Sequence, residues 1–522
     1  METAQEKFDK AVALHQAGKI GEAAAIYRDI LMADPNNVMV IHLLCLVAMQ
    51  FDNAQMVLGL SEQGLRVEPK FAVLHQDRAT ALRRMGLKEQ ALEAIDTALR
   101  LEKNADFYDT RASILRDMRR YAESVTCLET AIRIETGNPK FYNNLGIVLG
   151  RMGRNEEAIC YFDAFITMRP TAAEGYNNKA NVLKAMARYK DAIEFYDKAL
   201  AIDPNIFMGK ANKAISHLVL GEWEAGWENF EDRKPGNRPP EGDRFNSGKR
   251  WQGQTDNAAT IIIYNEQGLG DSIQFMRYIA HVQERVGRVI LQIQPALKKL
   301  VSINWPWLET IAPEDELPAH DYQCPLMSLP YVFKTRIDNV PLASGYIKAP
   351  EASISEWKEK LGNSHKKKIG LVWAGNPDHL NDHIRSIPLK LLEPILSMNE
   401  FQFYSLQKGD AAAAQLAELP KTIPVKALGD QLNDFTDTAG LLMNLDLLIC
   451  VDTSVLHLAG ALGVPVWGLF QYDPDWRWLL ERRDTPWYAS MRLFRQQSYG
   501  NWPDVVKELR GALKSFLSSE QI

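Results

Sequence analysis

The chain has 522 residues, which is too long for a single hydrophobic core and predicts several domains of roughly 100 to 200 residues each. A hydrophobic content of 46%, a charged content of 24% and a formal net charge of -6 are typical of a globular protein and lack the basic excess of nucleic-acid-binding proteins. We therefore expect no nucleic-acid partner and, because no run reaches the roughly 18 apolar residues of a bilayer span, no membrane span.

The cysteines and the first residues indicate the cytoplasm. The five cysteines are scattered and include no C-x-x-C pair, which argues against a disulfide framework and against a zinc site. The opening stretch METAQEKFDKAVAL mixes acidic and basic residues at helical spacing and has no apolar core, so it predicts a helix and not a signal peptide. A cytoplasmic protein with reduced cysteines is expected.

Small side chains recur along the first half of the chain every 34 residues, with one step of 33. They stand at Ala11, Cys45, Ala79, Ala112, Gly146, Ala180 and Ala214, and prolines that end helices stand at Pro35, Pro69, Pro170 and Pro204. The pattern resembles the tetratricopeptide (TPR) repeat, in which small residues let two antiparallel helices approach and stacked units share a continuous core. It predicts an all-α superhelix of about seven repeats over residues 1–232.

Asparagines at Asn144, Asn178 and Asn212 stand two residues before the small positions of the last repeats. One interpretation is that they are ordinary polar residues of a concave TPR face. The other is a ladder that grips the backbone of an extended peptide, because an amide both donates and accepts hydrogen bonds. The ladder resembles that of O-linked N-acetylglucosamine transferases, which implies a polypeptide acceptor or a partner protein. Earlier repeats carry other residues at this point, so the predicted ladder is confined to the last repeats.

After residue 232 the pattern changes. Residues 233–257 are rich in proline, glycine and charge and predict a linker. From residue 258 short apolar runs alternate with helical stretches, and the alternation restarts after residue 350. This predicts two Rossmann-like units, 258–350 and 351–522, with parallel sheets. Ligands bind outside the carboxyl ends of such strands, so a site is expected in the cleft between the two units.

The first of these strands runs into YNEQGLGDSI. Gly268 and Gly270 allow a tight turn and a close backbone approach, and Asp271 opens the next helix. Ile273 stands where a dinucleotide fingerprint needs its third glycine, and no G-K-[ST] follows, so neither a nicotinamide site nor a Walker loop is expected. Asp271 is either a functional carboxylate or only a helix cap.

A second junction of strand and helix lies in DLLICVDTSVLHLAGALG. Asp452, Thr453 and Ser454 stand where the strand ends and the helix begins, and His457 lies in the first turn. The free N–H groups and the dipole of such a terminus favour a diphosphate. The alternative is a capping turn with a histidine that faces the core.

The motifs GLGD and D-T-S-x-x-H-L-A-G-A-L-G-x-P resemble the heptosyltransferase-like glycosyltransferases (glycosyltransferase family 9), and the resemblance covers about residues 258–520. The closing DPDWRWLLERRDTPWY resembles a bacterial subgroup with TPR repeats before this domain. The resemblance implies a GT-B fold with an acceptor-side first unit and a nucleotide-sugar-side second unit. It also implies a catalytic base at Asp271, and contacts to the sugar and diphosphate from the segment that contains His457.

This chain departs from the family at a lysine that follows the first strand of the second unit. Arg385, or else Lys390, would take that phosphate role, and the guanidinium fork of an arginine suits a diphosphate. Gln407 and Lys408 follow the next strand and are expected to touch the nucleotide. Asp473 and Asp475 form a D-x-D pair, yet they follow the last predicted strand, so no metal site is expected. His457 is an alternative base or a phosphate contact.

Together these features predict a metal-independent, inverting glycosyltransferase that uses a nucleotide diphosphate sugar as co-substrate and no cofactor. The attacking hydroxyl must lose a proton and the leaving diphosphate must be stabilised, and the candidate residues suit both tasks. The TPR superhelix would present a polypeptide acceptor. Two alternatives stay open: a TPR scaffold with an inactive glycosyltransferase-like module, and sugar transfer to a lipid or polysaccharide.

Overall fold

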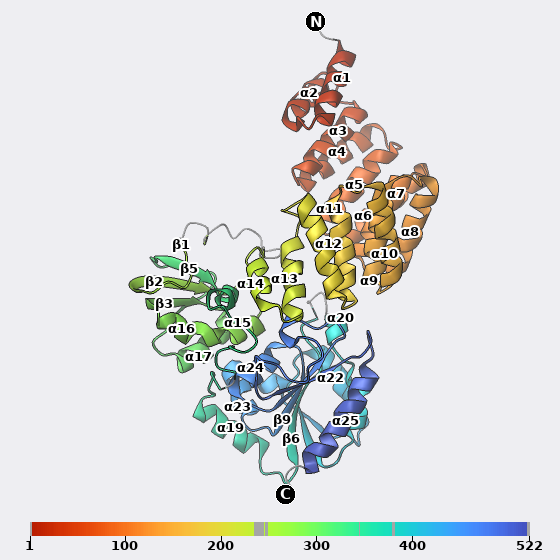
Figure 1. Ribbon diagram of the computed structural model, residues 1–522. Helices are drawn as coiled ribbons and strands as arrows, with labels where there is room; N and C mark the ends of the chain where they lie inside the picture. The colour runs from red at the N-terminus through yellow and green to blue at the C-terminus, as the bar shows by residue number, and fades with distance from the viewer. Residues whose placement is uncertain (1–2, 234–244, 246–248, 344, 378–381, 519–522) are drawn as a thin grey trace. The chain divides into compact units, whose positions relative to one another are not determined.

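The computed structural model describes residues 3–233, 245, 249–343, 345–377 and 382–518 (Figure 1). The chain divides into two compact units. The first comprises Met1–Leu183 and Asp197–Ile206, and the second comprises Lys184–Tyr196 and Phe207–Ile522. The helices α11 and α12 cross the boundary between them.

The first unit is built of helices that pack in consecutive pairs, α1 on α2 through α9 on α10. Their bounds are α1 Ala4–Gln16, α2 Ile20–Ala33, α3 Val38–Gln50, α4 Ala54–Val67, α5 Ala72–Arg84, α6 Lys88–Leu101, α7 Ala105–Asp117, α8 Tyr121–Ile134, α9 Pro139–Arg151 and α10 Asn155–Met168, followed by α11 Ala173–Ala185 and α12 Tyr189–Ile202. The small residues lie where the helices of a pair meet. A Cβ on Gly146 would lie 2.8 Å from the Phe162 ring, so only glycine fits this contact.

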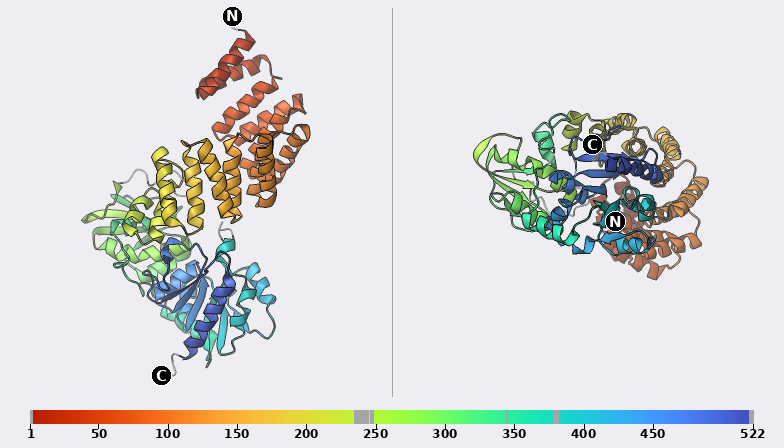
Figure 2. Two further views of the ribbon diagram at one scale, coloured as in Figure 1. Left: turned by 45° about the vertical axis from the view of Figure 1, so that its right-hand side comes forward. Right: turned by 90° about the horizontal axis from the view of Figure 1, so that it is seen from below.

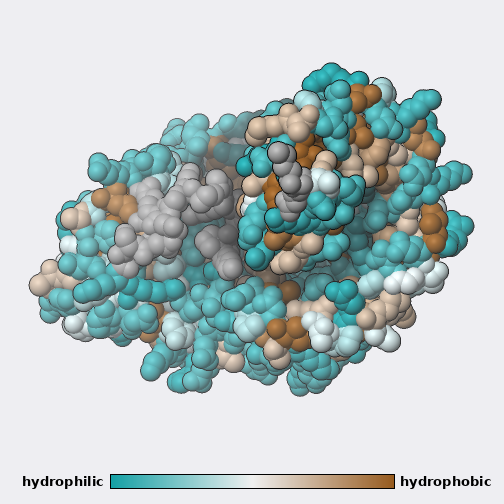
Figure 3. Space-filling view, turned by 90° about the horizontal axis from the view of Figure 1, so that it is seen from above, coloured by the Kyte–Doolittle hydropathy of each residue, from teal (hydrophilic) through white to brown (hydrophobic). Residues whose placement is uncertain are grey.

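Proline sets the ends of the second helices. Helix α2 ends two residues before Pro35, and α4, α10 and α12 end two residues before Pro69, Pro170 and Pro204. The residue before a proline avoids the helical region, so each helix stops at the preceding position. Met32 and Phe51 are among the exposed large hydrophobic side chains. On the face shown in Figure 3, hydrophobic residues lie among more numerous hydrophilic ones.

The second unit starts with a helix pair and a five-stranded sheet. Helices α13 Gly209–Val219 and α14 Trp223–Phe230 precede the strands β1 Lys249–Arg250, β2 Asp256–Tyr264, β3 Val286–Gln292, β4 Glu309–Ile311 and β5 Tyr322–Pro325. The strands are parallel and follow the order β1-β5-β2-β3-β4. The connecting helices are α15 Leu269–Phe275, η1 Met276–Tyr278, α16 Ile279–Gln283, α17 Pro295–Asn304, η2 Leu326–Ser328 and α18 Leu329–Val332.

A six-stranded parallel sheet follows, in the order β11-β10-β9-β6-β7-β8. Its strands are β6 Lys367–Val372, β7 Phe401–Ser405, β8 Val425–Ala427, β9 Leu447–Val451, β10 Val466–Phe470 and β11 Met491–Arg495. Its helices are α19 Glu351–Leu361, α20 Asp382–Arg385, η3 Leu389–Leu392, α21 Glu393–Leu396, α22 Asp410–Ala417, η4 Gly429–Gln431, α23 Phe435–Leu442, α24 Ser454–Leu462, η5 Trp476–Trp478 and α25 Trp502–Ser518. Helix α25 covers one face of the sheet (Figure 2).

Two inner strands carry the loops that hold the candidate residues. In β2, the centre of the first sheet, Ile261, Ile262 and Ile263 are fully buried, and β9 of the second sheet is buried throughout. Strands covered on both faces read as continuous apolar runs, which explains their clear sequence signal. The predicted order of helical repeats followed by two parallel sheets is confirmed.

The predicted linker 233–257 lies mostly outside the described residues. Within its described part, β1 pairs with β5, and Trp251 is buried with its ring against Phe333 at 5.9 Å between centroids. None of the helices in the described ranges is long and apolar enough to cross a bilayer.

Candidate functional site

Asp271 lies in the first turn of α15, directly after the loop that leaves β2. Its Oδ2 accepts a hydrogen bond of 2.9 Å from the Gly268 N–H, so the carboxylate caps its own helix. Gln294, beyond β3, fixes the same loop: its Nε2 donates to the Gln267 carbonyl at 2.9 Å, and its Oε1 accepts from Ser272 Oγ at 2.8 Å. Asp271 therefore caps its own helix, and a functional role of its carboxylate stays a prediction.

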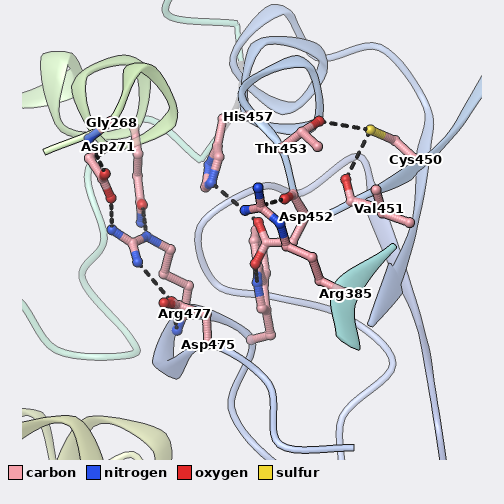
Figure 4. Close-up of polar contacts among 12 residues, drawn as sticks. Gly268, Asp271, Arg385, Cys450, Val451, Asp452, Thr453, His457, Asp475 and Arg477 are labelled. Carbon is pink, nitrogen blue, oxygen red and sulfur yellow. Dashed lines mark hydrogen bonds and ion pairs between the residues drawn. The ribbon is translucent and has the colours of Figure 1, made fainter. Parts of the chain in front are cut away.

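Arg477, which follows a strand of the second sheet, contacts Asp271. It lies in η5, after β10, and its Nη2 donates to Asp271 Oδ1 across a sequence separation of 206 residues (Figure 4). The same guanidinium donates from Nη1 to Asp475 Oδ1 at 2.7 Å and from Nε to Gln274 Oε1. Arg477 is 5% exposed, and Gln274 is fully buried. Asp271, from the helix after the first sheet's central strand, and Arg477, from the second sheet, thus belong to one buried hydrogen-bond network.

Burial and charge oppose each other in this network. Burial raises the pKa of Asp271, while the positive charge of Arg477 lowers it and the nearby Asp475 raises it further; the net shift is upward. Burial alone would weaken the charge of Arg477, yet Asp475 and Asp271 together raise its pKa. The result is a cation that stays charged next to a carboxylate that is more basic than an exposed aspartate.

Asp452 follows β9 and holds a second carboxylate in the same region (Figure 4). Its Oδ2 accepts a hydrogen bond of 2.8 Å from Trp478 Nε1, and its Oδ1 lies 3.8 Å from His457 Nε2. Burial, with the charge of Asp475, raises the pKa of Asp452 to about 6, although Arg477 acts in the opposite direction. The carboxyl of Asp452 is therefore a weaker acid than that of an exposed aspartate.

His457 is a buried, neutral imidazole. It is 5% exposed, and its Nδ1 shares a hydrogen bond of 2.8 Å with the Tyr488 hydroxyl. Burial lowers its pKa well below the usual value, and the positive charges of Arg477 and Arg277 lower it further. The predicted alternative of a histidine that faces the core fits this environment.

The start of α24 leaves its backbone donors without a side-chain cap. Thr453 occupies the N-cap position in an extended conformation and makes no capping hydrogen bond with its side chain. Its Oγ1 instead contacts Cys450 Sγ at 3.3 Å. Ser454 is the first helical residue and is partly exposed. Uncapped N–H groups at a helix start favour an anion.

Arg385 lies at this same end of the second sheet. Its Nη1 donates to the Asp452 carbonyl at 3.4 Å, and its Nε lies 3.2 Å from Asp382 Oδ1. A Cβ on Gly375, in the loop after β6, would come within 2.3 Å of Arg385 Nη2, so glycine leaves room for the guanidinium. Lys390 is exposed on η3. Of the two predicted cations, Arg385 is the one that contacts the Asp452 junction.

Gln407 and Lys408 follow β7 as predicted. Gln407 Oε1 accepts a hydrogen bond of 3.1 Å from the Ala374 N–H, next to the glycine that faces Arg385. Lys408 is exposed, and its Nζ donates to the Leu432 carbonyl. The loop after β6 thus lies between Gln407 and Arg385.

The D-x-D residues have separate partners. Asp473 Oδ1 accepts a hydrogen bond of 2.6 Å from the Tyr189 hydroxyl, whereas Asp475 binds Arg477. Within the part of the chain that the structure describes, no group of three or more His, Cys, Asp or Glu side chains is arranged to hold a metal ion.

The asparagines of the repeats bind neighbouring repeats. Asn144 Nδ2 donates to Asp109 Oδ1 at 2.5 Å, and Asn178 Nδ2 donates to Asn143 Oδ1 at 3.0 Å, so each amide is tied to the preceding repeat. All four side chains belong to the first unit. Asn212 lies on α13 of the second unit and is partly buried.

Sequence reasoning missed Arg477 and Gln274. Arg477 lies in the stretch DPDWRWLLERRDTPWY, whose sequence signals were the D-x-D pair and a resemblance to a subgroup. A basic residue between tryptophans directly after the D-x-D pair was the available signal. Gln274 comes one turn after Asp271, and its Nε2 is buried without a partner among the described residues. Nothing in the sequence indicated that Gln274 accepts a hydrogen bond from Arg477.

Comparison with protein families gives the decisive observation. Residues 403–511 match glycosyltransferase family 9 (heptosyltransferase), and residues 105–138, 139–171 and 173–206 match the tetratricopeptide repeat. The chain carries TPR repeats followed by a glycosyltransferase family 9 domain. Both predicted resemblances are confirmed, and the match to glycosyltransferase family 9 lies within the second predicted Rossmann-like unit.

The relative Protein FlbA of Caulobacter vibrioides is 29% identical over 335 residues, which is 58% of this chain and 54% of FlbA. The chain thus spans about half the length of this curated relative. Solved structures with similarity include YrrB, a TPR protein with an unusual peptide-binding site, at 16% identity and a TM-score of 0.29 over 36% of this chain and 97% of YrrB. The type IV pilus biogenesis factor PilW has 15% identity and a TM-score of 0.36 over 39% of this chain and 94% of PilW. Similarities of this size say nothing about function.

Proposed function

We propose that this protein is an inverting, metal-independent glycosyltransferase that moves a sugar from a nucleotide diphosphate sugar to a protein side chain. The observation that carries the proposal is the contact between Asp271, in the first turn of α15 after the central strand of the first sheet, and Arg477, in η5 after β10 of the second sheet. It places a carboxylate and a cation next to the Asp452 junction, where a diphosphate is expected.

Asp271 is the proposed base. The acceptor oxygen forms a bond to the anomeric carbon as the bond from that carbon to the diphosphate oxygen breaks. The hydroxyl proton passes to Asp271, and the diphosphate leaves with the electron pair; direct displacement inverts the anomeric carbon. Two donors, Gly268 N–H and Arg477 Nη2, bind this carboxylate, which leaves part of its roughly four acceptor positions for a substrate hydroxyl. The raised pKa of Asp271 strengthens it as a base.

The leaving diphosphate would meet Arg385 and the uncapped start of α24 at Thr453 and Ser454. Both features contact or adjoin Asp452, and positive charge that is fixed before the reaction stabilises the developing negative charge. Gln407 and Lys408, beyond the loop after β6, are proposed to contact the nucleotide. His457, being neutral and bound to Tyr488, is proposed as a hydrogen-bonding partner of the donor and not as the base.

The acceptor is proposed to be a polypeptide held by the repeats. TPR arrays offer an extended surface for peptides, and a lipid-linked acceptor would leave the repeats without an evident task. Asn144, Asn178 and Asn212 are the proposed contacts, although two of them also tie neighbouring repeats together. One amide can serve both tasks because it has two donors and an acceptor.

The test is a calorimetric titration of the full chain with UDP, GDP, ADP, CDP and dTDP. One nucleotide should bind at micromolar Kd, and Arg385→Ala should weaken it by about tenfold, the equivalent of one charge-assisted hydrogen bond. The exposed Lys390→Ala is the matched control and should bind as the wild type does. Binding of none of the five would overturn the proposal and favour the scaffold. If labelled sugar appears in lipid extracts and not in protein, the acceptor is a lipid and the proposed polypeptide acceptor is wrong.

A further inference from the structure

The last helix pair of the repeat region belongs to the core of the second unit. Leu218 of α13 and Trp223 and Trp227 of α14 lie in the same hydrophobic cluster as the inner residues of both sheets, including Ile261 and Leu448. We propose that α14, with Arg233 three residues after its end, is a positioning element that fixes Asp271 from two sides. The positioning of the Asp271 carboxylate is argued from the structure alone; that this positioning serves catalysis rests on the proposed function.

The first side runs through Arg233 to the loop that precedes Asp271. Arg233 Nη2 donates to Glu266 Oε2 at 2.5 Å and to Ser328 Oγ at 2.9 Å, and its Nη1 donates to the Phe230 carbonyl at 3.0 Å. The side chains of Arg233 and Glu266 are 7% and 10% exposed. Glu266 stands two residues before Gly268, whose N–H binds Asp271 Oδ2. A buried ion pair thus ties the end of α14 to the turn that orients the carboxylate.

The second side runs through Trp227 to the cation that binds Asp271. The ring of Trp227 meets the ring of Trp476 edge-on at 5.1 Å between centroids, and Trp227 Nε1 donates to the Thr335 carbonyl at 2.9 Å. The Arg477 guanidinium lies over the Trp476 ring at 4.3 Å. Neighbouring Trp223 stacks on Trp487 at 5.1 Å. Aromatic contacts from α14 therefore fix the surface on which Arg477 lies.

These two paths converge on opposite oxygens of one carboxylate. Arg233 acts on Oδ2 through the loop and Gly268, and Trp227 acts on Oδ1 through Trp476 and Arg477. Neither Arg233 nor Trp227 contacts Asp271, so both are positioning residues. Misplacement of a catalytic group by about 1 Å costs on the order of a hundredfold in rate, which gives such residues a measurable effect. The final repeat would then be required for transfer as well as for acceptor binding.

The experiment compares Arg233→Met and Trp227→Leu with the conservative variants Arg233→Lys and Trp227→Phe. Arg288→Met is the matched control, because Arg288 forms an exposed ion pair with Glu309 on the same sheet. The first readout is hydrogen exchange in residues 264–272, with strands β3 and β9 as internal references. The second is kcat against KM for the nucleotide-sugar donor found by the titration.

Arg233→Met and Trp227→Leu should speed exchange in residues 264–272 by about tenfold while β3 and β9 keep wild-type rates. They should lower kcat by about tenfold or more with KM within about twofold, and Lys or Phe should restore most of the loss. Unchanged exchange in 264–272, or an equal rise throughout the unit, would overturn the proposal. If exchange changes as expected but even the wild type transfers no sugar, the positioning role stands and the proposed function fails.

Discussion

Gly270 lies so close to His457 that a Cβ at this position would come within 2.8 Å of the imidazole Cδ2. This contact joins α15, which carries Asp271, to α24, whose start is the proposed diphosphate site. The absence of a side chain at position 270 therefore sets the distance between the two halves of the candidate site.

Gly270→Ala should push α15 away from α24 and weaken the pair of Asp271 and Arg477. We expect a loss of about 1–3 kcal/mol in the free energy of unfolding, typical of overpacking, and a lower kcat. Urea unfolding and initial rates measure both effects. Gly511→Ala is the control, because nothing lies within 4 Å of a Cβ there and α25 is helical. The control should be neutral or stabilising by about 0.5–1 kcal/mol. Equal behaviour of the two variants would contradict the role of Gly270.

Asp271→Asn tests the proposed base without changing the shape of the side chain. Its amide can still accept from the Gly268 N–H, so α15 keeps its cap. Loss of general base catalysis should lower kcat by about 10²–10⁴-fold, while the nucleoside diphosphate binds within about twofold of the wild type. Transfer rates and calorimetry test the two halves of this expectation. Wild-type turnover in this variant would remove Asp271 from the mechanism.

Asp452 should make the stability depend on pH. Its pKa is about 6 in the folded protein and near the ordinary value of 3.9 when unfolded, so the folded state binds the proton more tightly between these values. The stabilisation from this proton is complete below about pH 4 and is lost as the pH rises through about 6. The variant Asp452→Asn mimics the protonated form. Its free energy of unfolding, relative to that of the wild type, should therefore increase as the pH rises.

Urea midpoints at pH 5 and pH 7.5 measure this difference, which should reach on the order of 2 kcal/mol at the higher pH. Asp446→Asn is the control, because Asp446 lies exposed at the opposite end of β9. A gap between wild type and Asp452→Asn that stays constant with pH would show that Asp452 has an ordinary pKa.

Chelation of divalent cations should leave transfer intact. Arg385 and the start of α24 supply positive charge beside Asp452, and Arg477 adds a buried cation nearby. Rates in EDTA should match those in magnesium within about twofold, because the protein itself stabilises the diphosphate. A loss of activity in EDTA that magnesium restores would replace this mechanism with a metal-dependent one.

The sequence predicted the strands β2 and β9 well, because the run Ile261–Ile263 of β2 and the whole of β9 are buried and apolar, and the motifs GLGD and DTS follow them closely. Periodicity and turn residues are local signals, and they located Asp271 and Asp452 correctly at the starts of helices. They could not pair Asp271 with Arg477, because that contact joins positions 206 residues apart. Such a pair depends on how two sheets pack, which no local pattern encodes.

The role of α14 was hidden for a related reason. The small residues of α14 follow the same spacing as those of all the remaining repeats, so the sequence predicted that α14 belongs to the superhelix. The structure places Trp227 and Trp223 in the core of the second unit, where they meet Trp476 and Trp487. Tryptophans in both stretches were visible in the sequence, but their mutual contacts arise only on folding.

Asn178 tests whether the repeat asparagines bind an acceptor or only each other. Asn178→Ala removes the hydrogen bond to Asn143, which should cost about 0.5–1.5 kcal/mol in the first unit. If the amide also holds a peptide backbone, the double variant Asn178→Ala with Asn212→Ala should raise KM for a protein acceptor by about tenfold, while donor hydrolysis stays within about twofold. Thr167→Ala is the control, because Thr167 is exposed on α10 and bonds only its own helix. Stability loss with an unchanged acceptor KM would assign these amides to repeat packing alone.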